Sequence, residues 1–180
     1  MPGLNEMFGY SNRIYAPLKE PARRVVEAFQ NAARFLDTVQ ESVYIDAGMP
    51  CTSRVIHRLA HDMPKRFDVL GDALHERRLK VEYPPTPELT EPIEDIDKAL
   101  EIVTGTLDEI HEALEAFRFI ADRAEFRPFA LKADELIAQN SAEYTRILQL
   151  WAMWDSCGKA NAAAYDSWVG EFDGKSEGGD

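Results

Sequence analysis

The stretch that decides the topology of this chain is LKVEYPPTPELTEP, residues 79–92. Four of its 14 residues are proline, which favours an extended, polyproline-like path over a tight hairpin. Extended chain covers roughly 3.3 Å per residue, so this connection reaches about 45 Å. A 29-residue helix is nearly as long, since a helix rises about 1.5 Å per residue. The connection is therefore long enough to carry the chain from one end of a helical bundle to the other.

On both sides of this connection, apolar residues recur at the spacing of amphipathic helices, without a strand-like alternation. This pattern predicts four helices. They cover about residues 21–46, residue 52 or 53 to about 80, residue 92 to about 123, and residues 128–158. Four such helices of about 25 residues form a bundle, so the fold class is all-α. With the long connection, a bundle with one crossover is allowed, and an up-down-up-down bundle is the alternative.

Residues that favour helix ends support these boundaries. Gly48 can end the first helix, and Thr52 or Ser53 can cap the second. Thr90 and Pro92 suit the start of the third helix. The resulting organisation is an N-terminal arm over 1–20, a bundle over 21–158 and a C-terminal tail over 159–180, with its last residues expected to be disordered.

Composition narrows the function classes. A chain of 180 residues with 45% apolar residues can bury one core, and it has no run of roughly 18 apolar residues that would cross a membrane. The N-terminal residues lack the pattern of a signal peptide, which predicts a cytoplasmic protein. A net charge of −12 repels phosphate backbones, so nucleic acid is an unsuitable partner.

The second helix carries a polar stripe of metal-binding residue types. Taking 100° per residue from the inward Ile56, five side chains fall between about 100° and 200°: His57, His61, Asp68, Asp72 and Glu76. Imidazole and carboxylate are usual ligands of iron and zinc. A solvated polar face is the competing interpretation.

One ion cannot bind the whole stripe within one chain. His57 and Asp72 are 15 residues apart, which is roughly 22 Å along a helix. If two copies met antiparallel across a twofold axis, His57 and His61 of one chain would approach Asp72 and Glu76 of the other. The metal site would then belong to a homo-oligomer, at least a twofold dimer.

The segment from His57 to Pro85 resembles the Dps family of mini-ferritins, DNA-binding proteins from starved cells. His57, Asp72, Glu76 and Arg77 match the family in type and spacing, and the resemblance extends loosely over the helices. It implies a ferritin-like four-helix bundle with a long Pro-rich crossover between helices 2 and 3. It also implies an iron site between twofold-related subunits, with the metal ligands His57, His61, Asp72 and Glu76, and ferroxidase activity for iron storage or detoxification under oxidative stress.

The chain departs from the family pattern at three positions. His61 stands where the family has Asp, and Ile45 stands where a first-helix His is expected, so Glu41 or Asp46 is the candidate replacement. Fewer carboxylates shift the preference from iron toward zinc. Pro64 removes a helical hydrogen bond and predicts a kink, or a new helix that begins after Asp62.

The remaining candidates are weaker. His75 and His111 follow Asp72 and Asp108 by three residues but are expected at the surface or its boundary. Cys51 and Cys157 are expected as reduced thiols at one end of a one-crossover bundle. The leading hypothesis is therefore a Dps-like iron-binding subunit, and the alternative is a metal-free ferritin-like oligomeric scaffold or binding protein.

Overall fold

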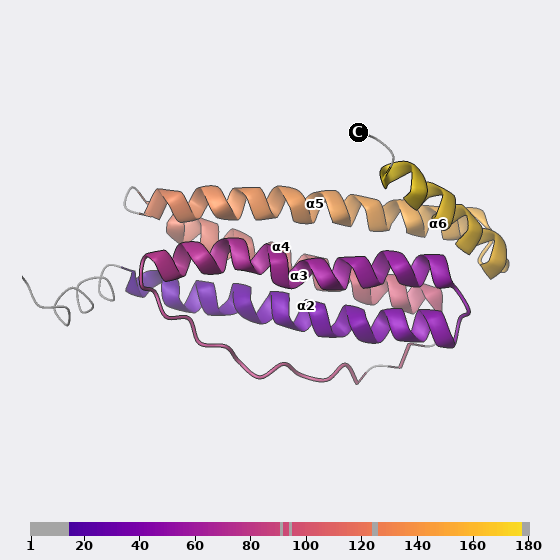
Figure 1. Ribbon diagram of the computed structural model, residues 1–180, viewed down its shortest axis with the longest axis horizontal. Helices are drawn as coiled ribbons and strands as arrows, with labels where there is room; N and C mark the ends of the chain where they lie inside the picture. Colours follow the sequence, from indigo (N-terminus) through magenta and orange to yellow (C-terminus); the bar gives the residue numbers. More distant parts are fainter. Residues whose placement is uncertain (1–14, 91, 94, 124–125, 178–180) are drawn as a thin grey trace, which may run out of the picture.

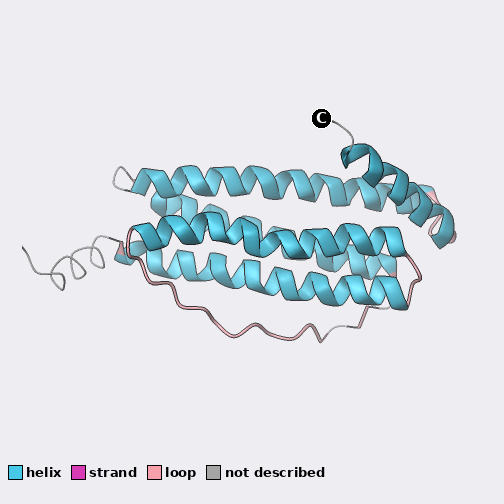
Figure 2. Ribbon diagram, viewed as in Figure 1, coloured by secondary structure: helices cyan, strands magenta, loops and turns pink. Residues whose placement is uncertain are grey.

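The computed structural model describes residues 15–90, 92–93, 95–123 and 126–177. Within these residues the chain is helical and contains no strand, as Figure 2 shows. The all-α prediction is therefore confirmed. The elements, in chain order, are a 3-10 helix η1 (Ala16–Leu18) and the α-helices α2 (Lys19–Ile45), α3 (Pro50–Glu76), α4 (Ile96–Ala121), α5 (Arg127–Ser156) and α6 (Ala162–Glu177).

Four long helices, α2 to α5, lie side by side, and α6 packs across one end of them on α3 and α5 (Figure 1). Four residues separate α2 from α3 and five separate α4 from α5, and each of these pairs is antiparallel. The segment after α3 runs extended beside α2 to the far end of the molecule, where α4 begins. As a result, α3 and α4 point in the same direction.

Three helices bury the face that their apolar spacing predicts. The inward residues of α2, α3 and α4 are almost all buried, including Leu36, Ile56 and Leu107 at 0% exposure. In α5 the spacing predicts an inward face that includes Leu148, and this is wrong, because Leu148 is 45% exposed while Leu150 and Trp154 are buried. Apolar residues lie on more than one side of α5, so spacing alone does not select its inward face.

Several helix boundaries differ from the prediction. Gly48 and Gly158 follow α2 and α5 with φ of +66°, as expected for glycines that end helices. However, α3 begins at Pro50 and ends at Glu76, short of the predicted end near residue 80. The third long helix, α4, begins at Ile96, because Asp95 accepts a hydrogen bond from Lys98 N at 2.8 Å and is the N-cap.

The N-terminus of α3 is capped from a distant part of the chain. Neither Thr52 nor Ser53 caps it, since both lie inside α3. Instead, Asp166 of α6 accepts hydrogen bonds from Cys51 N at 3.0 Å, from Thr52 N at 2.8 Å and from the Thr52 hydroxyl at 2.8 Å. A carboxylate at this position also interacts favourably with the helix dipole. This contact fixes α6 against α3.

The tail helix α6 is missed by the sequence analysis. Tyr165 and Val169 are fully buried, and Asp173 contacts Arg58 of α3 and Arg146 of α5. The expected disorder of the last residues, and most of the expected arm over 1–20, fall outside the described residues. The arm's described part is helical, and Leu18 is fully buried.

Pro64 does not divide the second long helix. The helix α3 runs without interruption from Pro50 to Glu76, so the prediction of a new helix after Asp62 is wrong. The proline ring lies on the exposed side of α3.

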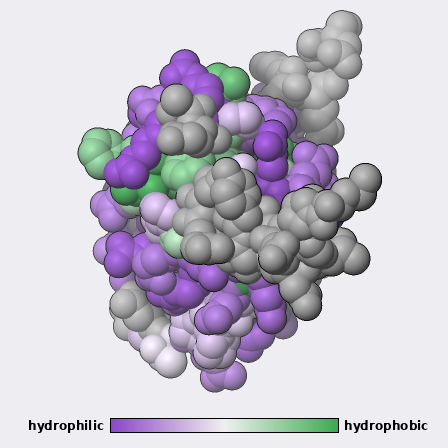
Figure 3. All heavy atoms as spheres, turned by 90° about the vertical axis from the view of Figure 1, so that its left-hand side faces the viewer, coloured by the Kyte–Doolittle hydropathy of each residue, from purple (hydrophilic) through white to green (hydrophobic). Residues whose placement is uncertain are grey.

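One end of the molecule is largely polar where the structure describes it. Hydrophilic side chains cover most of the coloured surface in Figure 3, which faces the end where α3 stops. No helix in the described ranges has the length and apolar character needed to cross a membrane.

Asp97 joins the start of α4 to the end of α5. Its carboxylate accepts hydrogen bonds from Trp151 Nε1 at 3.2 Å, Trp154 Nε1 at 3.1 Å and Lys159 Nζ at 2.6 Å. Burial acts to raise the pKa of Asp97, but these donors stabilise the carboxylate and leave its pKa lowered. The two tryptophans are thus packing residues that share one acceptor.

The melting temperature of an Asp97→Asn variant is expected to fall less with decreasing pH than that of the wild type. Because the pKa of Asp97 is lower in the folded state, its carboxylate stabilises the fold above about pH 3.9, and this contribution disappears as the pH falls through the folded-state pKa. The melting temperature of the wild type should therefore fall more steeply below about pH 4. Thermal melts by circular dichroism test this, with Asp134→Asn, an exposed partner of Arg118, as the control. Equal acid dependence in the wild type and Asp97→Asn would contradict it.

Candidate metal site

The polar stripe of α3 faces solvent along its whole length. His57, His61, Asp68, Asp72 and Glu76 are all exposed, whereas the opposite side of α3 is buried. The stripe is therefore accessible to an ion or to a second protein. Its members are too far apart along the helix to act as one group, since 15 residues separate His57 from Asp72 and correspond to roughly 22 Å.

A third residue, Asp37 of α2, lies beside the two histidines. One nitrogen or oxygen of each of Asp37, His57 and His61 lies within 4.8 Å of the others. The shortest described approach to the carboxylate is from His57 Nδ1 to Asp37 Oδ1, at 4.0 Å. The imidazole rings of His57 and His61 are 4.3 Å apart between centroids and inclined at 65°. We refer to Asp37, His57 and His61 as the surface triad.

The turn between α2 and α3 determines this meeting. Because α2 ends at Ile45 and α3 begins at Pro50, the antiparallel helices place residues near 40 opposite residues near 53. The hydrogen bond from the Ser53 hydroxyl to Gln40 O, at 3.0 Å, fixes that register. One turn farther along, Asp37 meets His57, and His61 follows on the same face of α3.

The triad has the donor set of a divalent transition-metal site. Metal–nitrogen and metal–oxygen bonds of roughly 2.1 Å place neighbouring ligand atoms of a tetrahedral site about 3.4 Å apart. The separations of up to 4.8 Å within the triad are longer. Metal binding at the triad therefore requires small rotations of these exposed side chains.

Asp37 is the residue that sequence reasoning misses. The sequence offers Glu41 and Asp46 as candidates to replace the absent first-helix histidine, since they lie near Ile45. The structure assembles neither with the histidines. Asp46 instead accepts a hydrogen bond from the Ser42 hydroxyl at 2.8 Å. The length of the turn between α2 and α3 is the signal that points to Asp37, because it sets the register of the two helices.

The other titratable candidates do not converge within the described residues. His75 is exposed in the last turn of α3, and His111 is half-buried on α4. Glu143 of α5, which could have served an internal metal centre, accepts a hydrogen bond from Arg66 at 2.8 Å. In the part of the chain that the structure describes, the surface triad is the one group of three or more His, Cys, Asp or Glu residues with ligand atoms in reach of one ion.

The two cysteines are free thiols in the structure. Both are half-buried, and burial together with the nearby Asp166 carboxylate raises the pKa of Cys51. A raised pKa keeps a thiol protonated and weakly nucleophilic. Cys51 therefore has the character of a packing residue under α6, where Gly170 leaves room for its sulfur.

Comparison with models of known protein families finds none that matches this chain, and comparison with curated proteins finds no match either.

Proposed function

We propose that this chain is an iron-binding subunit of the ferritin-like type, similar to the Dps family, whose metal site includes the surface triad. The observation that carries the proposal is the approach of Asp37, His57 and His61 to within 4.8 Å on an accessible face. Two imidazoles and one carboxylate on one side of an ion leave its other positions open to substrate or oxidant. This arrangement suits Fe(II) and also Zn(II).

The proposed fold is a ferritin-like bundle formed by α2 to α5, with the segment between α3 and α4 as its Pro-rich crossover. The parallel direction of α3 and α4 supports this topology, as does the extended path beside α2 (Figure 1). Buried apolar residues fill the inward faces of α2, α3 and α4. An internal di-iron centre of the usual ferritin kind therefore has no ligands there, and the metal site belongs on the outer face.

A second copy of the chain completes the proposed site. In an antiparallel, twofold arrangement of α3, Asp72 and Glu76 of one protomer would approach His57 and His61 of the other. Tyr44 and Ile45 are 59% and 65% exposed at the end of α2. Ile45 is eight residues after Asp37 and shares its side of the helix. A homodimer interface over this face would cover such apolar side chains.

The proposed reaction is oxidation of Fe(II), the metal being the substrate. Each Fe(II) gives up one electron, so hydrogen peroxide takes electrons from two Fe(II) ions and two protons to form two waters. The protein would supply a site that binds the reduced ion and leaves an open position for the oxidant. The acidic chain, with its net charge of −12, would also raise the local concentration of cations.

Removing one imidazole is expected to weaken this site at least tenfold. We expect His57→Ala to lower both the metal content of the purified protein and the affinity for Fe(II) under anaerobic conditions, because half of the strong nitrogen donors is lost. Isothermal titration with Fe(II) and with Zn(II), followed by an Fe(II) oxidation assay with peroxide, measures these quantities. His75→Ala, an exposed histidine of the same helix outside the triad, is the matched control.

Four outcomes would reject all or part of the proposal. Equal metal content and affinity in wild type, His57→Ala and His75→Ala would exclude the triad as a metal site. A wild type that binds neither metal would favour a metal-free scaffold. Selective, tight Zn(II) binding without Fe(II) oxidation would keep the site but reject the ferroxidase activity. Solution mass is a further check, since a monomer in the presence of metal excludes a site shared by two chains.

A further inference from the structure

Next to the surface triad, the groove between α2 and α3 widens into a cavity of about 480 Å³. Its floor is apolar and largely aromatic: Phe29 is 3% exposed, and its ring centroid lies 6.5 Å from that of Phe67. Pro64 and Ala33 complete this floor. The volume falls within the roughly 300–1,000 Å³ that is usual for small-molecule sites. We call it the strap cavity.

The segment after α3 forms one wall of the strap cavity. Thr86 lines the cavity directly, and the ring of Tyr83 meets that of Phe67 edge to face, with centroids 6.1 Å apart. Glu88 lies 3.7 Å from the guanidinium of Arg34, a further lining residue. Three different segments of the chain therefore build this cavity, which distinguishes it from a simple groove between two helices.

The polar lining of the strap cavity includes two carboxylates and one cation. Asp37 and Asp68 contribute carboxylates, and Gln30 Oε1 is buried with no hydrogen-bond partner in the described protein. The lining cation, Arg34, is paired with Glu88. Carboxylates form their strongest hydrogen bonds with cationic N–H donors. The lining thus favours a donor-rich cation over an anion.

We propose that the strap cavity binds a small organic ammonium ion with an aromatic or alkyl body. Its ammonium group would donate to the carboxylates of Asp37 and Asp68. Its apolar body would lie against Phe29, Phe67 and Pro64, where aromatic faces also attract a cation. This proposal goes beyond iron binding and does not depend on a metal at the surface triad.

Asp37 is common to the strap cavity and the surface triad, so the two sites are coupled. The same carboxylate lines the strap cavity and belongs to the surface triad. An ammonium ion that holds this carboxylate competes with a divalent metal for it. By reciprocity, saturating metal weakens ammonium binding by the same factor that ammonium weakens metal binding.

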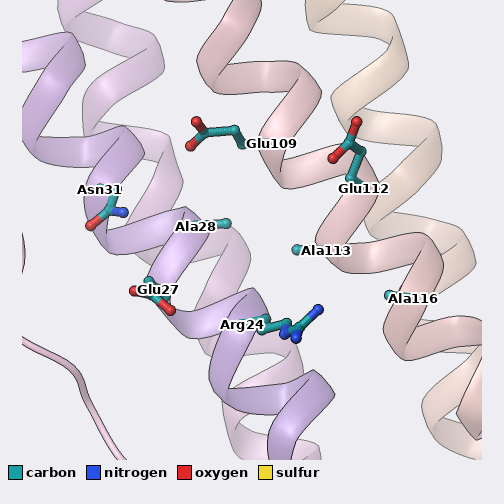
Figure 4. Close-up of a pocket in the computed structure, with 8 residues that line it drawn as sticks. All are labelled: Arg24, Glu27, Ala28, Asn31, Glu109, Glu112, Ala113 and Ala116. Atoms are coloured by element: carbon teal, nitrogen blue, oxygen red, sulfur yellow. The ribbon is translucent and has the colours of Figure 1, made fainter.

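A second groove provides an internal comparison. Between α2 and α4, Glu27, Glu109 and Glu112 surround a cavity of about 450 Å³ whose floor includes Ala28 and Ala113 (Figure 4). The residues that line it, all within the described ranges, include no aromatic side chain. Glu27 is already paired with Arg23 at 3.0 Å. Carboxylates are therefore present in both grooves, but the aromatic floor belongs to the strap cavity.

The test titrates 2-phenylethylammonium into the full chain, without metal, by isothermal calorimetry. Two probes with the same ring isolate the charge: neutral 2-phenylethanol and anionic 3-phenylpropanoate. We expect the ammonium to bind at least about tenfold more tightly than the alcohol, and the anion not to bind, because charge-assisted hydrogen bonds are the stronger kind. Equal binding of ammonium and alcohol, tighter binding of the anion, or no binding of the ammonium would overturn the proposal.

Variants locate the site and separate it from the metal. Asp68→Asn is expected to weaken ammonium binding about tenfold and to leave metal affinity unchanged. His57→Ala is expected to weaken metal binding and to leave ammonium binding unchanged. Glu112→Gln, which removes a carboxylate from the α2–α4 groove, should change neither. If Asp68→Asn and Glu112→Gln weaken ammonium binding equally, the attraction is a property of the whole acidic surface and the strap cavity is not the site.

Discussion

An Asp173→Ala variant is expected to unfold about 5 to 10 °C below the wild type, because about 2 to 3 kcal/mol of stabilisation is lost. Asp173 is 6% exposed and pairs with Arg58 of α3 and with Arg146 of α5. Its removal leaves two guanidinium groups facing each other without the shared carboxylate. Breaking a fully buried pair costs about 3 to 5 kcal/mol. We expect the smaller loss of about 2 to 3 kcal/mol, because Arg58 and Arg146 are 34% and 24% exposed and retain some contact with water.

The loss should be concentrated in α6. This helix is held by Asp173 at one end and by Asp166 on the N-terminus of α3 at the other. We expect amides of residues 162–177 to exchange hydrogen faster, before the four long helices are affected. Glu171→Ala, which removes an exposed carboxylate from the same helix, is the matched control. Equal melting temperatures for these two variants would show that the Asp173 ion pairs do not dock α6.

The inward faces of the long helices could be predicted because burial follows local spacing. Leu36, Ile56 and Leu107 recur with their neighbours every three or four residues, and each is fully buried. In α5, Leu148 and Leu150 are both apolar but only Leu150 is buried. Local spacing specifies an inward side when apolar residues occupy one side of a helix. It does not when they occupy two.

The helix boundaries depend on contacts that local sequence does not reveal. Asp166 caps α3 from 114 residues away, and no pattern near Thr52 indicates such a partner. The same acidic residue helps to hold α6, whose buried Tyr165 and Val169 are too few for a clear apolar stripe. Long-range contacts therefore stabilise both the start of α3 and the tail helix.

Local sequence predicts two members of the candidate site and misses the third, because the third depends on a contact between two helices. His57 and His61 are one turn apart on one helix, so local geometry alone places them together. Asp37 joins them only through the register of two antiparallel helices, which the turn from Asp46 to Met49 sets. A change of one residue in that turn would rotate Asp37 away from His57.

Mixing two inactive variants is expected to restore about one quarter of wild-type Fe(II) oxidation, if two protomers share each site. His57→Ala loses a ligand from the triad side, and Asp72→Ala loses one from the partner side. In a hybrid dimer, one site combines the intact His57 of one chain with the intact Asp72 of the other, while the second site lacks both. Random pairing makes about half of the dimers hybrid, each with one working site of two. Co-expression at equal levels followed by a peroxide-dependent oxidation assay measures the recovery.

The same experiment discriminates a shared site from a site within one chain. If Asp37, His57 and His61 suffice for oxidation, Asp72→Ala alone remains active and the mixture gives the average of its two components. If two chains are required, each variant alone is inactive and activity returns only when both are present in the same assembly. A mixture of His75→Ala with Glu112→Gln, both outside the proposed site, should keep full activity. If Asp72→Ala is inactive and the mixture does not recover activity, the twofold arrangement is contradicted. In that arrangement the hybrid dimer contains one complete set of ligands and must be active.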